Sequence, residues 1–179
     1  MAVRTMSSIS VSWRLAAVLI LLVGLVGCDK KTSDTFTAKL GDQWFTLETA
    51  LTEDKQARGL GGRESIADDG GMIFVFDNDR ERSFWMLDCL VDIDIAYIDR
   101  AGFIVSTYTM KAQPPRAPGE SDSAYRGRIP SKAYPSNGMA RFVIELRAGR
   151  INELGLKRGQ NLDLDLDRLK MLADSVDKR

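Results

Sequence analysis

Residues 84–99 read FWMLDCLVDIDIAYID, and the predicted fold is organised around this stretch. It joins a dense apolar run to four aspartates, and an apolar run of this kind has to be buried. Asp94 shares one face of the expected strand with Ala96 and Ile98, while the side chains of the opposite face are also apolar. We therefore predict a strand at residues 93–98 that is buried on both faces and carries a buried carboxylate.

Apolar and β-branched runs bounded by turn residues continue on both sides of this centre. Gly41-Asp42 predicts the turn of a hairpin, and residues 77–80 predict a turn after a continuous apolar run. Strict alternation of Leu and Asp at residues 162–167 predicts a strand with one wet face. The predicted strands are 36–40, 44–49, 72–76, 83–86, 93–98, 103–108, 139–146 and 162–167.

Helices are expected at only a few places. Thr52 can cap a helix over residues 53–60, and Asp167 can cap a closing helix that has an apolar stripe. A short helical turn is expected among the glycines of residues 149–159. Many short strands and few helices predict an α+β fold, a mostly antiparallel, β-rich compact domain, rolled or barrel-like, over residues 36–179.

The N-terminal segment has the pattern of a bacterial lipoprotein leader. Arg4 and Arg14 occur without any acidic residue, and the apolar run at 15–27 is too short to span a bilayer comfortably. Leu25-Val26-Gly27-Cys28 resembles the lipobox, in which the cysteine is lipid-modified and becomes the new N-terminus. We expect a signal peptide at 1–27, lipidation (palmitate) of Cys28 and a polar tether at 28–35. A plain secretory signal is the alternative.

This leader implies a location and a first partner. Several acyl chains on one cysteine anchor a protein stably, so we expect contact with a membrane at the extracytoplasmic face of the cell envelope. Asp29 resembles an enterobacterial sorting signal that favours the inner membrane. Once Cys28 is lipidated, Cys89 is the last thiol, which excludes an intramolecular disulfide and favours a buried, inert Cys89.

Composition excludes several classes of function. The chain has 25 basic residues, 25 acidic residues and no histidine. The lack of histidine rules out Ser-His-Asp and Cys-His catalysis and every His-ligated metal site. A balanced charge differs from the basic footprint of nucleic-acid-binding proteins, so we expect no nucleic-acid partner, and no cofactor is implied.

Four motifs follow one another along the chain: Arg58–Gly61, Gly71–Phe76, Phe84–Asp99 and Val143–Leu146. Their order resembles the DUF192 (UPF0127) family of uncharacterised bacterial and archaeal proteins, although the first motif is shifted and lacks the family's methionine. The resemblance implies a compact β-rich α+β domain without an established activity. The family has Lys, Asn and Thr where this chain has Leu87, Asp88 and Cys89, so any site formed there is altered in this member.

Arg58 and Asp94 are the first candidate site residues. A buried carboxylate either pairs with a cation or keeps its proton, and the family pattern retains both residues. We predict an ion pair between them that fastens the helix to the sheet, with a ligand site on the same residues as the alternative. Asp88 and Asp92 lie close along the chain and could add carboxylates for acid–base chemistry or Ca²⁺, but solvated single acids are more common, and we expect no metal.

Residues 111–136 hold all five prolines and form a long irregular segment of a kind that is usually functional or mobile. Trp85 and Tyr134 could line a ligand groove near this segment. Trp85 is expected to belong to the core, and Tyr134, beside several basic side chains, to the surface. With Arg58, Asp88 and Asp94 they complete the set of ligand-binding candidates.

These observations lead to one functional prediction and two alternatives. We predict a membrane-tethered lipoprotein of the cell envelope whose domain binds an unidentified envelope ligand or protein without catalysis. The first alternative is a hydrolase-like enzyme that uses Asp88, Asp92 and Asp94 with Arg58. Such an enzyme needs polar groups that converge in an enclosed pocket. A purely structural envelope protein is the second alternative.

Overall fold

The computed structural model describes Met1 and residues 35–176. The predicted signal peptide after Met1, the lipidation site Cys28, Asp29 and all but the last residue of the tether lie outside the described residues. Chain contacts divide the protein into the units Met1–Lys30 and Lys31–Arg179, and the fold described below belongs to the second unit. Among the described residues, no helix is both long and apolar enough to cross a membrane.

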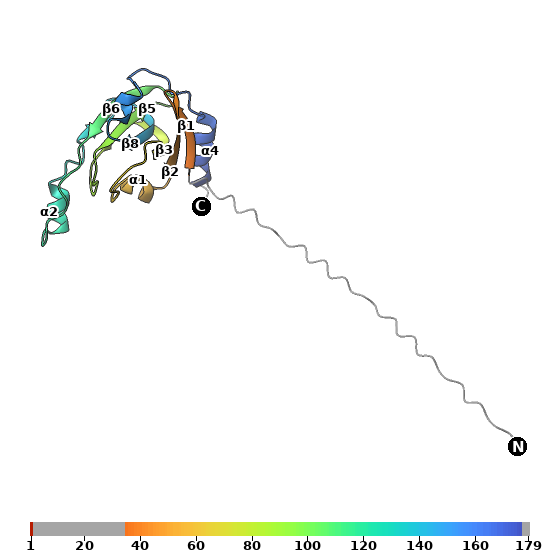
Figure 1. Cartoon of the computed structure of the whole chain (residues 1–179), viewed down its shortest axis with the longest axis horizontal. Helices are drawn as coiled ribbons and strands as arrows, with labels where there is room; N and C mark the ends of the chain where they lie inside the picture. Colours follow the sequence, from red (N-terminus) through yellow and green to blue (C-terminus); the bar gives the residue numbers. More distant parts are fainter. Residues whose placement is uncertain (2–34, 177–179) are drawn as a thin grey trace. The chain divides into compact units, whose positions relative to one another are not determined.

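A six-stranded sheet with the order β1-β2-β3-β8-β5-β6 forms the body of this unit (Figure 1). Neighbouring strands pair antiparallel except β2 and β3, which are parallel, and the separate strands β4 and β7 also pair antiparallel. The predicted antiparallel, β-rich α+β class is therefore confirmed, with β1 and β6 at the two edges of the described sheet. The bounds are β1 (Thr35–Leu40), β2 (Gln43–Ala50), β3 (Gly70–Arg80), β4 (Ser83–Phe84), β5 (Ile93–Ile98), β6 (Ile104–Met110), β7 (Tyr134–Pro135) and β8 (Ala140–Arg147).

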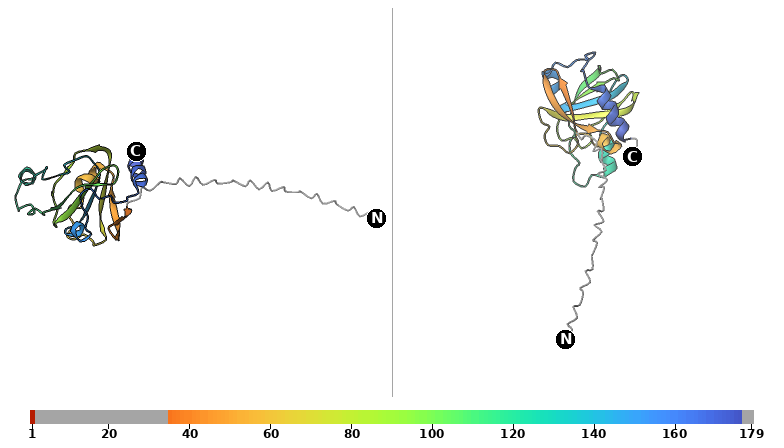
Figure 2. Two further views of the ribbon diagram at one scale, coloured as in Figure 1. Left: turned by 90° about the horizontal axis from the view of Figure 1, so that it is seen from above. Right: turned by 90° about the vertical axis from the view of Figure 1, so that its right-hand side faces the viewer.

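Short helices flank this sheet. They are α1 (Glu53–Arg58), α2 (Asp122–Gly127), α3 (Arg150–Glu153) and α4 (Leu166–Val176). Thr52 caps α1 as predicted, since its hydroxyl oxygen accepts a hydrogen bond from the Lys55 backbone N–H at 3.3 Å. Figures 1 and 2 show α2 and α4 at opposite ends of this unit.

The hydrophobic core has two parts, one on each face of the sheet. One cluster joins Phe36, Ile144 and Leu169 of α4, and the other joins Phe74 and Tyr97 with residues of the 84–93 segment. All six residues of β5 are buried, which confirms the strand predicted from two apolar faces. The views in Figure 2 show a strongly twisted sheet, as expected for strands with right-handed twist.

The turn predicted at residues 77–80 is wrong. β3 continues to Arg80, which pairs with Ala140 of β8 beyond an irregularity in the register after Val75. The side chains of this extension are polar because they lie where the sheet meets solvent, while the backbone pairing persists. The strand predicted at 83–86 is shorter than expected and ends at Phe84.

The strand predicted at residues 162–167 is also wrong. Leu162 and Leu164 are buried and the intervening Asp163 is exposed, as the alternation indicates. Asp163, however, has a positive φ of 49°, and the segment makes only an isolated bridge, at Asn161. α4 then begins at Leu166, and Asp165 takes the capping role expected of Asp167, because its Oδ1 accepts the Arg168 N–H at 3.0 Å.

Gly71 lies in β3 at a point where the backbone of β8 leaves no room for a side chain. Its φ is 149°, and an added Cβ would lie 2.3 Å from the carbonyl oxygen of Glu145. We expect Gly71→Ala to lower the free energy of unfolding by about 1–3 kcal/mol in urea titrations, because rigid backbone has to move. Gly127→Ala is the matched control, since nothing lies within 4 Å of its added Cβ. Equal stability of the two variants would contradict this account.

Candidate functional site

Asp94 is buried as predicted, and neutral groups satisfy it. The Thr109 hydroxyl donates to Oδ1 at 2.7 Å, and the Ile151 backbone N–H donates to Oδ2 at 2.8 Å. Ile151 lies in the first turn of α3, where Gly149 occupies the N-cap and provides no side-chain cap. Asp94 therefore caps α3 from a neighbouring strand, which places a carboxylate at the positive end of the helix.

The predicted ion pair between Arg58 and Asp94 is wrong. Arg58 lies at the exposed end of α1, in a depression of about 270 Å³ that Glu48 and Arg63 also line. Glu48 and Arg63 pair with each other there, with Oε1 and Nη1 2.7 Å apart. Because Asp94 already has two neutral donors, removal of Arg58 leaves no buried charge unpaired, and the stability loss implied by the ion pair is not expected.

Asp88 and Asp92 have separate partners as well. The Tyr125 hydroxyl donates to Asp88 Oδ1 at 2.9 Å, and Asp88 itself adopts a positive φ of 57°. Asp92 accepts from Lys111 Nζ at 2.7 Å and from the Ala112 N–H, and these two bonds lower the pKa of Asp92. The structure thus does not bring the three aspartates together, and no cluster of three potential metal ligands exists among the described residues.

Tyr134 lies in β7, where it pairs with Phe84 of β4. The Lys111 backbone N–H donates to the Tyr134 hydroxyl oxygen at 3.0 Å, and the Tyr97 hydroxyl donates to the Tyr134 carbonyl. The proline-containing segment is therefore fastened to the body at Tyr134. Its predicted basic surface is largely neutralised, because Arg126 and Arg128 pair with acids of the same segment.

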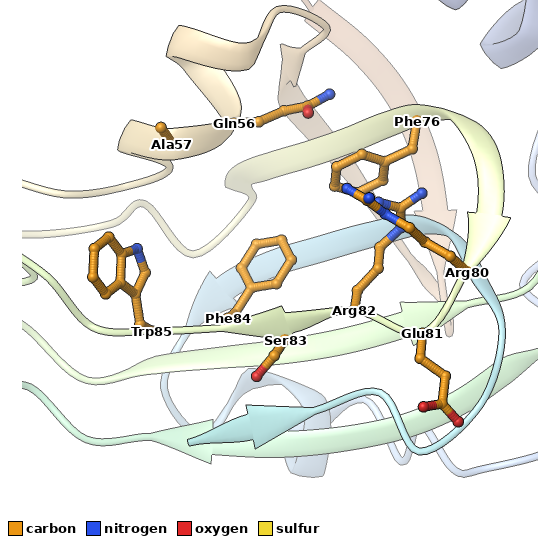
Figure 3. A pocket seen from close by; sticks show the side chains of 9 residues that line it. All are labelled: Gln56, Ala57, Phe76, Arg80, Glu81, Arg82, Ser83, Phe84 and Trp85. Carbon is orange, nitrogen blue, oxygen red and sulfur yellow. The ribbon is translucent and has the colours of Figure 1, made fainter. Parts of the chain in front are cut away.

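A cleft of about 370 Å³ lies between α1, the end of β3 and β4. Figure 3 shows Arg82, Phe84 and Trp85 on one side of the chain, whereas Glu81 and Ser83 point to the other side. Trp85 was expected in the core, but it is only half-buried and lines this cleft. The lining residues are Gln56, Ala57, Phe76, Arg80, Glu81, Arg82, Ser83, Phe84 and Trp85.

Arg82 is the residue that gives this cleft its chemistry. It is only 7% exposed, and its Cζ lies 3.5 Å from the centroid of the Phe76 ring. Nε donates to the Ala140 carbonyl at 2.9 Å and Nη2 to the Asn78 carbonyl at 2.6 Å, so its acceptors are neutral. Among the described residues, Nη1 makes no hydrogen bond and no carboxylate forms an ion pair with Arg82.

The charge of Arg82 is consequently poorly compensated. Burial lowers the pKa of Arg82 to about 10, and the positive charges of Arg80 and Arg141 act in the same direction, while the nearby charges of Asp77 and Asp79 offset this only in part. Arg150, equally buried, differs because Glu153 lies 2.8 Å from its Nη1. Buried charges in proteins are normally paired directly, and among the described residues Arg82 has no carboxylate in direct contact.

Sequence reasoning missed Arg82, Phe76 and Gln56 as site residues. The predicted turn at 77–80 ended the strand too early and assigned the arginines to a loop. The one local signal is that Arg82 and Phe84 alternate with the exposed Glu81 and Ser83 at strand spacing. The alternation becomes informative only when the strand is extended past Phe76.

Glu145, in the second half of β8, is a second unusual group. The Leu60 backbone N–H donates to its carboxyl group, but Oε2 is buried without a partner. Burial raises the pKa of Glu145 to about 8, with the Leu60 bond and the charge of Arg63 acting the opposite way. The acid is therefore mostly protonated at neutral pH. Burial likewise raises the pKa of Cys89 to about 12, which leaves its thiol unreactive.

Comparison with known proteins agrees with this architecture. The family model of DUF192, described as "Uncharacterized ACR", matches residues 36–164. The chain belongs to the DUF192 family. No curated protein sequence matches this DUF192 protein.

Among the solved structures that resemble it are the following two. A candidate transcription regulator from Sinorhizobium meliloti 1021 is 25% identical, with a TM-score of 0.56 over 69% of this chain and 84% of that chain. A protein of unknown function from Novosphingobium aromaticivorans DSM 12444 is 22% identical, with a TM-score of 0.52 over 71% and 81% of the two chains. The second likeness concerns the fold alone.

Glu145 makes the stability of this DUF192 protein depend on pH. Because its pKa is higher in the folded chain, the unfolded chain loses the proton first, and stability falls as pH rises from about 4.5 to about 8. The contribution of this one group is at most about 1.4 kcal/mol per pH unit. We expect Glu145→Gln to flatten urea unfolding free energies across pH 5–8, whereas exposed Glu64→Gln should keep the wild-type slope. An unchanged slope in Glu145→Gln would exclude this role.

Proposed function

We propose that this DUF192 protein is a membrane-tethered lipoprotein of the cell envelope whose domain binds an organic anion without catalysis. The proposed site is the cleft between α1, β3 and β4. One observation carries the proposal: Arg82 is buried against Phe76, has only neutral hydrogen-bond acceptors and keeps Nη1 unbonded among the described residues. An anion in the cleft would supply the missing countercharge.

The residues that line the cleft indicate the chemistry of the part of the ligand that carries the anionic group. Phe84 and Trp85 line the same cleft, with Phe84 between Trp85 and the Arg82 guanidinium in Figure 3, and Arg80 adds a second positive charge. An anionic group attached to a flat apolar body matches this combination, because the rings favour apolar contact and the arginines favour charge. A volume of about 370 Å³ falls in the usual range for small-molecule sites.

Binding fits these groups better than the hydrolase alternative does. Asp88, Asp92 and Asp94 are held by different partners, so they do not provide the convergent acids that the alternative required. The Ser83 hydroxyl, the one alcohol that lines the cleft, points away from Arg82 in Figure 3. The Gln56 amide that also lines the cleft already donates to the Ala50 and Val75 carbonyls, so the donors left for an anion are the guanidinium groups.

The proposal of a membrane tether is supported by the N-terminal leader, residues 1–27. An apolar run that ends directly on Leu25-Val26-Gly27-Cys28 is the pattern of a lipid-modified cysteine, and the residues that follow it are polar. Such an anchor would keep the binding domain and its cleft close to the membrane. The proposed anchor and the proposed cleft depend on separate residues, so each can be tested alone.

The anion site predicts discrimination between a carboxylate and its neutral amide. In isothermal titration calorimetry, 2-naphthoate should bind the full-length chain at least about tenfold more tightly than 2-naphthamide, since hydrogen bonds to charged groups contribute about 1.5–3 kcal/mol. Arg80→Gln and Trp85→Ala should each weaken 2-naphthoate several-fold. Arg58→Gln, an exposed arginine of a different depression, is the matched control and should not weaken it. Equal affinity for carboxylate and amide would refute an anion site.

The anchor predicts that Cys28 determines membrane association. Wild-type protein should sediment with membranes after cell disruption, and Cys28→Ser should move to the soluble fraction or remain an uncleaved precursor with altered mass. Cys89→Ser controls for a general effect of thiol loss, because Cys89 is buried in the domain. Metabolic labelling with an alkyne palmitate analogue should mark wild type and Cys89→Ser only. Labelled Cys28→Ser would overturn the lipoprotein proposal.

A further inference from the structure

The edge strand β1 presents unpaired backbone groups. Leu40 and Gln43 flank the two-residue hairpin turn, so their backbone groups form a hydrogen-bonded pair. Because hydrogen-bonded and non-hydrogen-bonded pairs alternate along an antiparallel ladder, the backbone N–H and C=O groups of Lys39 and Thr37 point away from β2. The same alternation holds on β2, where the Thr46 backbone N–H points away from β1 and donates to the Asp69 carbonyl at 2.9 Å. In the part of the chain that the structure describes, the outward N–H and C=O groups of Thr37 and Lys39 have no partner.

A groove of about 450 Å³ runs beside this open edge. One wall is β1 with Gly41, and the other is the segment of residues 160–165. Ala38 and Leu162 are buried at its base, whereas Trp44 on the neighbouring strand is 65% exposed. The groove therefore combines a polar backbone edge, an apolar base and a large exposed ring.

The far wall of the groove is acidic. Asp163 and Asp165 both line it and are both exposed. Within the described residues neither carboxylate forms an ion pair, and the only hydrogen bond made by either side chain is the helix cap at Asp165 Oδ1. Lys39 is the one basic residue of the lining, so the groove carries a net negative charge.

We propose that this groove binds an extended basic peptide segment of another protein, which adds as a strand to β1. The backbone of such a segment repeats donors and acceptors every two residues, about 6.8 Å apart, which is the spacing between the outward groups of Thr37 and Lys39. Lysine or arginine side chains of the segment would meet Asp163 and Asp165. The site shares no lining residue with the anion cleft and does not depend on it.

Fluorescence anisotropy with a dye-labelled, end-blocked peptide of alternating Lys and Val tests this proposal on the full-length chain. We expect saturable binding below 1 mM peptide, and at least tenfold weaker binding of the matching Glu and Val peptide. Thr37→Pro removes the outward N–H without touching the pairing of β1 with β2, and should weaken binding at least tenfold. Thr37→Ala keeps that N–H and should bind within about twofold of wild type, which separates backbone pairing from side-chain contact.

Two further variants test the acidic wall and the rim. Asp163→Asn should weaken the Lys peptide several-fold at low salt and much less at high salt, because exposed charges are screened. Trp44→Ala should weaken it at all salt concentrations.

Thermal unfolding followed by circular dichroism checks that Thr37→Pro is folded, and 2-naphthoate titration provides a second check at the separate cleft. Equal binding to Thr37→Pro, equal binding of the Glu peptide, or absence of binding at 1 mM would each overturn the proposal. A concentration-dependent dimer lost in Thr37→Pro would assign the edge to a second copy instead.

Discussion

Burial of β5 on both faces is the constraint on which the remaining structure depends. A strand with two apolar faces needs a layer on each side, and the chain provides α4 with the C-terminal leucines on one side and the 84–93 segment with Leu60 on the other. Asp94 is the one carboxylate within this strand. Its bonds to Thr109 and Ile151 join β6 and α3 to β5, so that the group which would disrupt an apolar core instead connects three elements.

Two buried arginines show how the same side chain serves structure in one place and offers binding in another. Arg150 stands beside Glu153 and bonds the Asp68 carbonyl, so its charge is compensated within the fold. Arg82 also orders the chain, because it holds the carbonyls of Asn78 and Ala140 together at the irregular end of β3. It lines a cleft, and within the described residues no acid pairs with it directly. That difference separates a structural ion pair from a candidate anion site.

The two candidate surfaces have opposite character. The cleft at Arg82 is cationic and aromatic and is of a size that suits a small molecule, whereas the groove along β1 is acidic and bordered by unpaired backbone. Open strand edges tend to pair with other chains unless charge or geometry prevents it. We propose the first surface for a small ligand and the second for a protein. The two functions would then be separable by mutation.

The amino-acid sequence alone determined the features that depend on local periodicity. These are the strand at 93–98 with two buried faces, the hairpin around Gly41-Asp42, the cap at Thr52 and the β-rich class. Family membership also followed from motif order and is confirmed over residues 36–164. Tertiary structure alone decided the partner of Asp94 and the environment of Arg82, because those contacts join residues up to 58 positions apart. The hydrophobic pattern of the sequence indicates that a residue is buried, but only the folded chain determines which distant donor or acceptor that residue contacts.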